Sequence, residues 1–279
     1  MMNCKETGIE MKQWNSDEEL FALMKEKLYT PVVGDILDQM GYKHQFLPAN
    51  IRPLEALVPA DAYVDRSQPD NRLKVAGYAC TVLENDVFEN PKKPFGYLTE
   101  ALDQLKPGEV YIATGAHHSA LWGELLTATA KARGAAGAVL DGYSRDTPQV
   151  MGQNFPVFCT QCWAQDSSVR TYVCDYRCTI EIGQVTIHDG DLVFGDIDGV
   201  LIIPKEIKDE VIEKALIKAS GEKTVRKAIE GGMTDNRFLG YYKERLELLW
   251  TAKRGYFRLH MKIMWLRPCR SFLQERGQR

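Results

Sequence analysis

Hydrophobic and polar positions follow two different periods along this chain. Near the N-terminus, apolar residues recur at helical spacing from Leu20 to Leu28, behind Ser16 and Glu19, which form a capping-box pair. A second helix is predicted from Thr30-Pro31 to the residues before Gly41, because proline favours a first helical turn and glycine follows a last one. Between residues 75 and 204, apolar runs of strand length predominate. The expected strands are 75–83, 109–114, 138–140, 157–158, 192–194 and 199–203, with further short strands within 173–185.

Helical spacing returns after Pro204. A helix is expected over 205–219, Glu222 and Arg226 lie four residues apart on the stretch that follows, and a last helix is expected over 237–250. The pattern divides the chain into N-terminal helices with a wrapping loop (1–74), an α/β core (75–204), C-terminal helices packing on the core or on a neighbouring subunit (205–252) and a basic tail (253–279). Strands alternating with helices and then following one another indicate an α/β, three-layer sandwich with a mixed sheet.

The composition mainly argues against particular classes of partner and location. The chain has 279 residues, a net charge of −3 and 44% hydrophobic residues, so it is large enough for a normal core and lacks the charge typical of nucleic-acid binding. No apolar run approaches the roughly 20 residues that span a bilayer, and the N-terminus lacks the apolar core of a signal peptide. We therefore expect no nucleic-acid or membrane partner and a cytoplasmic location.

The segment Gly115–Asp146 contains the strongest candidate chemistry. It reads GAHHSALWGELLTATAKARGAAGAVLDGYSRD, and it predicts a helix from about Ala120 to Arg133 with Gly134 as its C-cap. A buried strand follows, and a tight turn then places Arg145 beside Asp146. A helix N-terminus, an arginine and a carboxylate together suit the binding of a small carboxylate with a divalent metal.

Four cysteines permit a second interpretation of part of the core. Cys159, Cys162, Cys174 and Cys178 have the spacing C-x2-C-x11-C-x3-C, which resembles a small zinc ribbon. The flanking sequences favour strands and contain no glycine-rich knuckle, so reduced, partly buried thiols are the preferred interpretation, and zinc stays the alternative.

Three motifs in order resemble the RraA-like family. These are WGELL, then DGYSRD about twenty residues later, and then GDLVFGDIDGV. The family includes the 4-hydroxy-4-methyl-2-oxoglutarate/4-carboxy-4-hydroxy-2-oxoadipate aldolases and the regulators of ribonuclease E activity. The resemblance covers about residues 30–205 and implies a swivelling β/β/α fold, a homotrimer or hexamer, and sites between subunits.

The resemblance also assigns roles to residues. Asp146 would bind Mg²⁺ (or Mn²⁺), and Arg145 would contact the keto or enolate oxygen of a pyruvate unit in a 2-oxo acid substrate. Glu124, where the aldolases carry an aspartate, would orient a water ligand of the metal. Backbone N–H groups of Gly123, Leu125 and Leu126 would hold the substrate carboxylate, Asp35 would handle protons from a neighbouring subunit, and Glu222 would be an acid from a neighbour near the site.

These assignments predict a metal-dependent carbon–carbon lyase that cleaves a 4-hydroxy-2-oxo acid to pyruvate, with oxaloacetate decarboxylase activity as a side reaction. Two alternatives stay open: a non-catalytic regulator that binds a ribonuclease, and a related lyase acting on a sugar-acid derivative. Each residue also has a structural interpretation, since an Arg-Asp pair after a strand often forms only a surface ion pair. His117 and His118 are interpreted as substrate contacts or loop packing rather than metal ligands, and Trp122 as core or wall of the site.

Overall fold

The computed structural model describes residues 13–58, 72–89 and 92–232. The described chain as far as Ala219 belongs to one compact unit, and the chain from Ser220 onward belongs to a second. The fold and the site below concern the first unit. Within the described residues, no helix is both long enough and apolar enough to cross a membrane.

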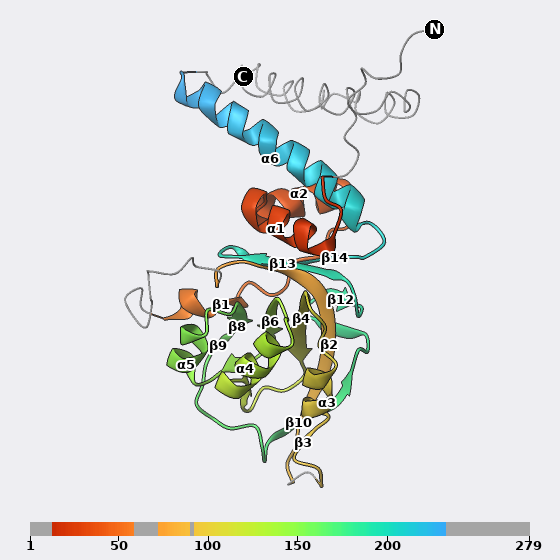
Figure 1. The fold of residues 1–279 in the computed structure, drawn as a ribbon, viewed down its shortest axis with the longest axis vertical. Coiled ribbons are helices and arrows are strands. Elements are labelled where there is room, and N and C mark those ends of the chain that lie inside the picture. Colours follow the sequence, from red (N-terminus) through yellow and green to blue (C-terminus); the bar gives the residue numbers. More distant parts are fainter. Residues whose placement is uncertain (1–12, 59–71, 90–91, 233–279) are drawn as a thin grey trace, which may run out of the picture. The chain divides into compact units, whose positions relative to one another are not determined.

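A mixed sheet forms the centre of the fold (Figure 1). Its longest strand, β2 (Val75–Asp86), pairs in parallel with β4, which is followed outward by β6, β8 and the short antiparallel β1. On its other edge, β2 pairs antiparallel with β13 along its first half and with β10 along its second half. The remaining bounds are β1 (Arg52–Pro53), β3 (Phe95–Gly96), β4 (Glu109–Thr114), β6 (Gly137–Leu140), β8 (Val157–Cys159), β10 (Thr171–Tyr176), β13 (Leu192–Asp196) and β14 (Gly199–Ile203).

Alternation along β4 shows why both faces of the sheet are covered. Tyr111 and Ala113 contribute to a core beneath three helices, whereas Val110 and Ile112 contribute to a core on the opposite face. Successive strand residues point to opposite faces, so a strand with a run of apolar residues, as β4 has at 110–113, needs cover on both sides. The three helices are α3 (Leu98–Asp103), α4 (Glu124–Ala132) and α5 (Thr147–Gly152). The opposite face is covered by β13, β14 and the hairpin of β11 (Ile180–Ile182) and β12 (Val185–Ile187).

The outer face of β13 and β14 contacts a further helical layer. Phe194 and Leu201 pack there with α1 (Asp17–Lys27), α2 (Thr30–Gln39) and the first turns of α6 (Lys208–Glu230). The Asp196 carboxylate fixes the start of α2 by accepting hydrogen bonds from the Thr30 N–H and hydroxyl, both at 2.7 Å. The motif GDLVFGDIDGV therefore has a structural function in this layer.

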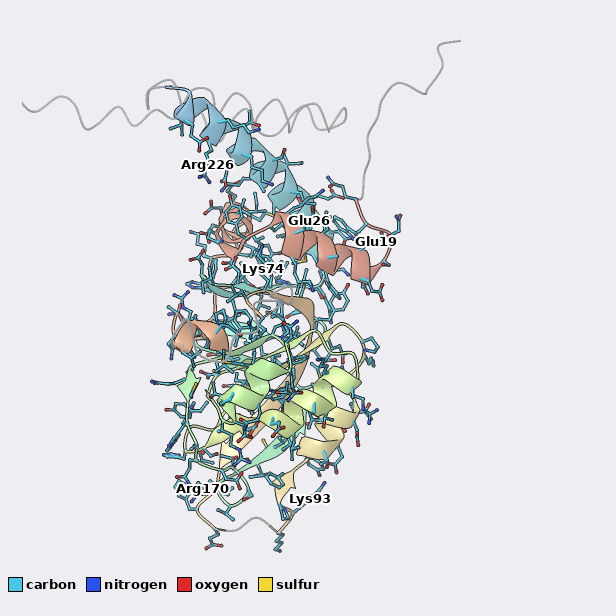
Figure 2. The ribbon with its side chains drawn as sticks, turned by 60° about the vertical axis from the view of Figure 1, so that its left-hand side comes forward. Glu19, Glu26, Lys74, Lys93, Arg170 and Arg226 are labelled. Atoms are coloured by element: carbon cyan, nitrogen blue, oxygen red, sulfur yellow. The ribbon has the colours of Figure 1, made fainter. Side chains whose placement is uncertain are left out.

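The predicted helix ends at the N-terminal side are confirmed. The Ser16 hydroxyl accepts the Glu19 N–H at 3.2 Å, and the Glu19 carboxylate accepts the Asn15 N–H at 2.6 Å. At the other end of α1, the ammonium of Lys74, labelled in Figure 2, donates to the carbonyls of Lys25 and Leu28 at 2.8 and 3.0 Å. The carbonyls of a helix's last turn have no hydrogen-bond donor within the helix, so a cation beside them stabilises the C-terminus.

Two predicted helix boundaries are wrong. Residues Ala120–Trp122 form strand β5, which pairs with β7 (Tyr143–Ser144), so the site helix α4 begins only at Glu124. Its C-cap is Arg133, and the predicted C-cap, Gly134, is the next residue, with a left-handed φ of +76°. The C-terminal helix begins at Lys208 and continues to Glu230. The helix predicted over 237–250 and the basic tail lie outside the described residues. A mixed α/β fold with helices at both ends is confirmed, while the swivelling arrangement and the four-segment division stay predictions.

Candidate functional site

A small three-stranded sheet positions the candidate site residues. Strand β7 lies between β5 and β9 (Gln161–Cys162), and all three strands are parallel. The Arg145 N–H donates to the Trp122 carbonyl at 2.9 Å, and the Trp163 N–H donates to the Ser144 carbonyl at 2.9 Å. The sheet thus fixes the main chain of Arg145 directly beside the start of α4.

Asp146 adopts a backbone conformation that is uncommon for a residue with a side chain. Its φ is +53°, in the left-handed region, where Asp and Asn occur more often than other non-glycine residues. It lies at the N-cap of α5, yet its side chain makes no capping bond there. Instead, the carboxylate accepts the Glu124 N–H at 3.2 Å and so caps the neighbouring helix α4. The turn therefore directs the Asp146 carboxylate towards the α4 N-terminus.

Gly123 lies where these groups meet. A β-carbon at this position would come within 2.7 Å of an Asp146 carboxylate oxygen and 3.3 Å of Arg145 Cγ. Its φ of −168° is extended backbone that any residue adopts, so a β-carbon here would act by displacing the Asp146 carboxylate. The absence of a side chain lets Asp146 and Arg145 approach the helix start closely.

The helix start has unused hydrogen-bond donors. The first bond of the α4 ladder runs from the Thr127 N–H to the Gly123 carbonyl at 3.0 Å, so the N–H groups of Leu125 and Leu126 have no acceptor within the helix. The Leu125 side chain is 76% exposed, and the Glu124 side chain is exposed as well. Such N–H groups, with the positive end of the helix dipole, suit a carboxylate ligand.

Two carboxylates flank the Arg145 guanidinium beside this helix end. Arg145 Nη1 lies 2.8 Å from an Asp166 oxygen, and Arg145 Nε lies 3.7 Å from an Asp146 oxygen. All three of these side chains are partly exposed, and Glu124 contributes a further negative charge at the helix start. The excess of negative charge favours a cation as an additional ligand.

A buried chain of hydrogen bonds supports the helix start from below. The Trp122 indole donates to the Thr127 hydroxyl at 2.8 Å, and this hydroxyl donates to the Gly123 carbonyl at 2.9 Å. Trp122 is 1% exposed and packs on Tyr111 with a ring-centroid distance of 5.0 Å. The interpretation of Trp122 as core or wall is confirmed, and its polar end also fixes Gly123.

Of the two remaining predicted site residues, Asp35 lies apart from this group within the first unit, and Glu222 belongs to the second unit. Asp35 lies on α2, in the layer beyond β13 and β14, and its carboxylate pairs with Lys218 of α6. Glu222 lies on α6 beyond Ser220, in the second unit, where Arg226 pairs with Glu230 at 2.9 Å. Both residues were expected to act from a neighbouring subunit, and this role stays a prediction.

The two histidines have a structural contact. The Asp86 carboxylate accepts the N–H groups of His117 and His118 at 2.9 and 3.1 Å and lies 2.7 Å from His118 Nδ1. Burial would raise the pKa of Asp86, but these hydrogen bonds hold it below its usual value. This contact agrees with the loop-packing interpretation of the pair.

The cysteines do not form a cluster. Cys159 and Cys162 lie on β8 and β9, whereas Cys174 lies on β10, where its thiol contacts the Leu83 carbonyl at 3.3 Å, and Cys178 follows that strand. No group of three or more His, Cys, Asp or Glu side chains suited to a metal occurs in the described part of the chain. The structure therefore gives no support to the zinc alternative.

Two site residues were not predicted from the sequence. Asp166 lies twenty-one positions after Arg145 in an irregular segment, and Thr127 looks like an ordinary helix residue. Neither carries a periodic or motif signal. The contact of Asp166 with Arg145 arises because β9 and the segment after it return to the edge of β5, where the Ala120 N–H donates to the Gln165 carbonyl at 2.8 Å. The Thr127 hydroxyl bonds residues four and five positions before it, Gly123 and Trp122.

The residues present fit a hard divalent cation. Asp146 offers an exposed carboxylate whose position is fixed by a helix N–H, and it reaches the α4 start closely because Gly123 has no side chain. Mg²⁺ typically takes one or two protein carboxylates and keeps several waters, so a single well-placed carboxylate is an adequate donor set.

Part of the chain is similar in sequence to known proteins. The chain is 37% identical to Protein DlpA of Legionella pneumophila over 114 residues, which are 41% of this chain and 18% of that protein. It is 35% identical to a protein of Halalkalibacterium halodurans named putative 4-hydroxy-4-methyl-2-oxoglutarate aldolase, over 132 residues. That match spans 47% of this chain and 62% of the relative, so the chain covers less than two thirds of either curated relative.

Solved structures show the same fold. A crystal structure described as novel cellulases from microbes associated with the gut ecosystem matches with a TM-score of 0.64 and 32% identity, covering 82% of this chain and 97% of that one. Residues 30–202 match the RraA-like family, described as Aldolase/RraA, as the three motifs predicted. Since this match covers more than half of the chain, the protein belongs to the RraA-like family.

Proposed function

We propose that this protein is a divalent-metal-dependent lyase that cleaves a 4-hydroxy-2-oxo acid to pyruvate and decarboxylates oxaloacetate as a side reaction. One observation carries the proposal. The Asp146 carboxylate, the Arg145 guanidinium and the open N-terminus of α4 converge around Gly123, which has no room for a β-carbon. The relative named putative 4-hydroxy-4-methyl-2-oxoglutarate aldolase supports the same chemistry.

Each residue has a defined task in this reaction. The substrate carboxylate binds the N–H groups of Leu125 and Leu126 at the helix start. Arg145 donates to the 2-oxo oxygen, where negative charge develops as the enolate forms. Asp146 would hold Mg²⁺ or Mn²⁺, and the ion would supply positive charge to stabilise the same enolate.

Bond cleavage begins with loss of the C4 hydroxyl proton. The Glu124 carboxylate, exposed at the helix start, accepts this proton through a water. The C3–C4 bond then breaks, the C4 oxygen becomes a carbonyl, and the electron pair passes into the pyruvate enolate, which is protonated at C3. Oxaloacetate loses CO2 from C4 by the same movement of electrons, so one site serves both reactions.

Pyruvate release tests the proposal. Oxaloacetate and 4-hydroxy-4-methyl-2-oxoglutarate are incubated with Mg²⁺ or EDTA, and pyruvate is measured with lactate dehydrogenase. We expect turnover that EDTA abolishes and that Asp146→Asn lowers at least about a hundredfold, since the charge of the metal ligand is lost. Asp103→Asn is the matched control, because Asp103 forms an exposed pair with Arg133 away from α4's N-terminus.

The outcomes separate the alternatives. Activity that persists in EDTA contradicts the metal-dependent mechanism. Mg²⁺ binding without turnover of either acid would indicate another substrate, such as a sugar-acid derivative. Absence of both Mg²⁺ binding and turnover would favour a regulatory, protein-binding function.

A further inference from the structure

Arg145 needs an anchor to act on one oxygen atom. Its side chain is 37% exposed, and a long, exposed arginine samples many rotamers unless a partner holds it. Its main chain is fixed by the bond to the Trp122 carbonyl, but that bond does not restrain the guanidinium. The contact with Asp166 Oδ1 at 2.8 Å is the shorter of its two carboxylate contacts, since Asp146 lies 3.7 Å away.

Asp166 is itself held in place. The Ser168 hydroxyl donates to its carboxylate, and Arg170, labelled in Figure 2, donates from Nη1 to its carbonyl at 3.1 Å. The preceding residue, Gln165, accepts the Ala120 N–H at the edge of β5. The hydrogen bond from Ser168 lowers the pKa of Asp166, burial opposes this, and Arg145 lowers it further, so the carboxylate stays ionised at neutral pH.

The two carboxylates beside Arg145 therefore differ in function. Asp146 is the proposed metal ligand, and a bound metal would compete with Arg145 for its negative charge. Asp166 can pair with the guanidinium whether or not a metal is bound to Asp146. The five N–H donors of a guanidinium lie in one plane, so holding one end of the plane also orients the remaining donors.

We propose that Asp166 is a positioning residue, which anchors the Arg145 guanidinium so that its remaining donors meet the 2-oxo oxygen of the substrate. This inference rests on the proposed function and deepens it. Asp166 touches neither the metal nor the substrate, and it acts through Arg145 alone.

A double-mutant cycle tests the inference by kinetics. Asp166→Asn, Arg145→Lys and the double variant are compared on oxaloacetate with Mg²⁺. We expect Asp166→Asn to lower kcat about tenfold while KM changes less than about threefold, because an anchor of this kind acts mainly on the developing charge. In the Arg145→Lys background the same change should have little further effect. Asp103→Asn, which breaks a comparable exposed Asp–Arg pair, should leave kcat unchanged.

A spectroscopic readout tests the anchor without turnover. In protein labelled with ¹⁵N-arginine, the Arg145 Nε–H signal is identified by its loss in Arg145→Lys. Asp166→Asn should shift this signal, and Asp103→Asn should not. An equal loss of kcat in both backgrounds, or an unmoved Nε–H signal, overturns the inference. If the wild type releases no pyruvate from either acid, the proposed function fails by itself, and the Nε–H signal still decides whether Asp166 anchors Arg145.

Discussion

Replacing Thr127 with valine tests the buried hydrogen bonds beneath the site. Valine has nearly the same shape as threonine but lacks the hydroxyl, so it removes the bond from the Trp122 indole at 2.8 Å and the bond to the Gly123 carbonyl at 2.9 Å. The Gly123 carbonyl keeps the Thr127 N–H, whereas the indole N–H loses its acceptor at a position that is 1% exposed. A buried donor without a partner costs about 1–3 kcal/mol, so we expect a loss of about 2 kcal/mol in the free energy of unfolding.

Thr129 provides a matched control on the same helix. Its hydroxyl also donates to the carbonyl four residues earlier, that of Leu125 at 2.9 Å, but its side chain is only partly buried and holds no second partner in the described bonds. Thr129→Val should therefore change the free energy of unfolding by less than about 0.5 kcal/mol. Urea unfolding of the metal-free protein, followed by circular dichroism, measures both values. Equal losses for the two variants, or a loss in Thr127→Ser as large as in Thr127→Val, would refute the reasoning.

Two further predictions concern the site and the core beside it. Gly123→Ala should weaken Mg²⁺ binding and turnover at least about tenfold, because the new β-carbon displaces the Asp146 carboxylate; Gly152→Ala, where a β-carbon meets no atom within 4 Å, should leave calorimetric Mg²⁺ affinity and activity unchanged. Burial, together with the nearby Asp86, raises the pKa of Glu84 from 4.5 to about 8. The folded state then binds a proton that the unfolded state has lost, so stability should fall as pH rises from about 4.5 to 8. Glu84→Gln should flatten the fall in urea midpoints between these pH values, and an unchanged slope would contradict the assignment.

The sequence determined most of the secondary structure and the centre of the site. Apolar runs located strands such as β4, whose bounds match the prediction at both ends, because a short apolar run that follows a Pro-Gly turn favours a buried strand. Local rules also placed the N-cap at Ser16 and the left-handed glycine just after the C-cap of α4, since each depends on atoms within a few residues. The motifs around Gly123 and Arg145-Asp146 led to the family and to the side chains that the structure brings together.

The tertiary structure decided what depends on distant segments. Ala120–Trp122 has no local signal against a helix, and it forms a strand because β7 offers it a hydrogen-bonding partner. The direction of the Asp146 carboxylate, towards α4 instead of its own helix, follows from the packing of two helix starts against each other. Asp166 reaches Arg145 only because the chain after β9 returns beside β5. Sequence periodicity shows which face of an element is buried. Hydrogen bonds between residues far apart in the chain depend on the topology, which periodicity does not encode.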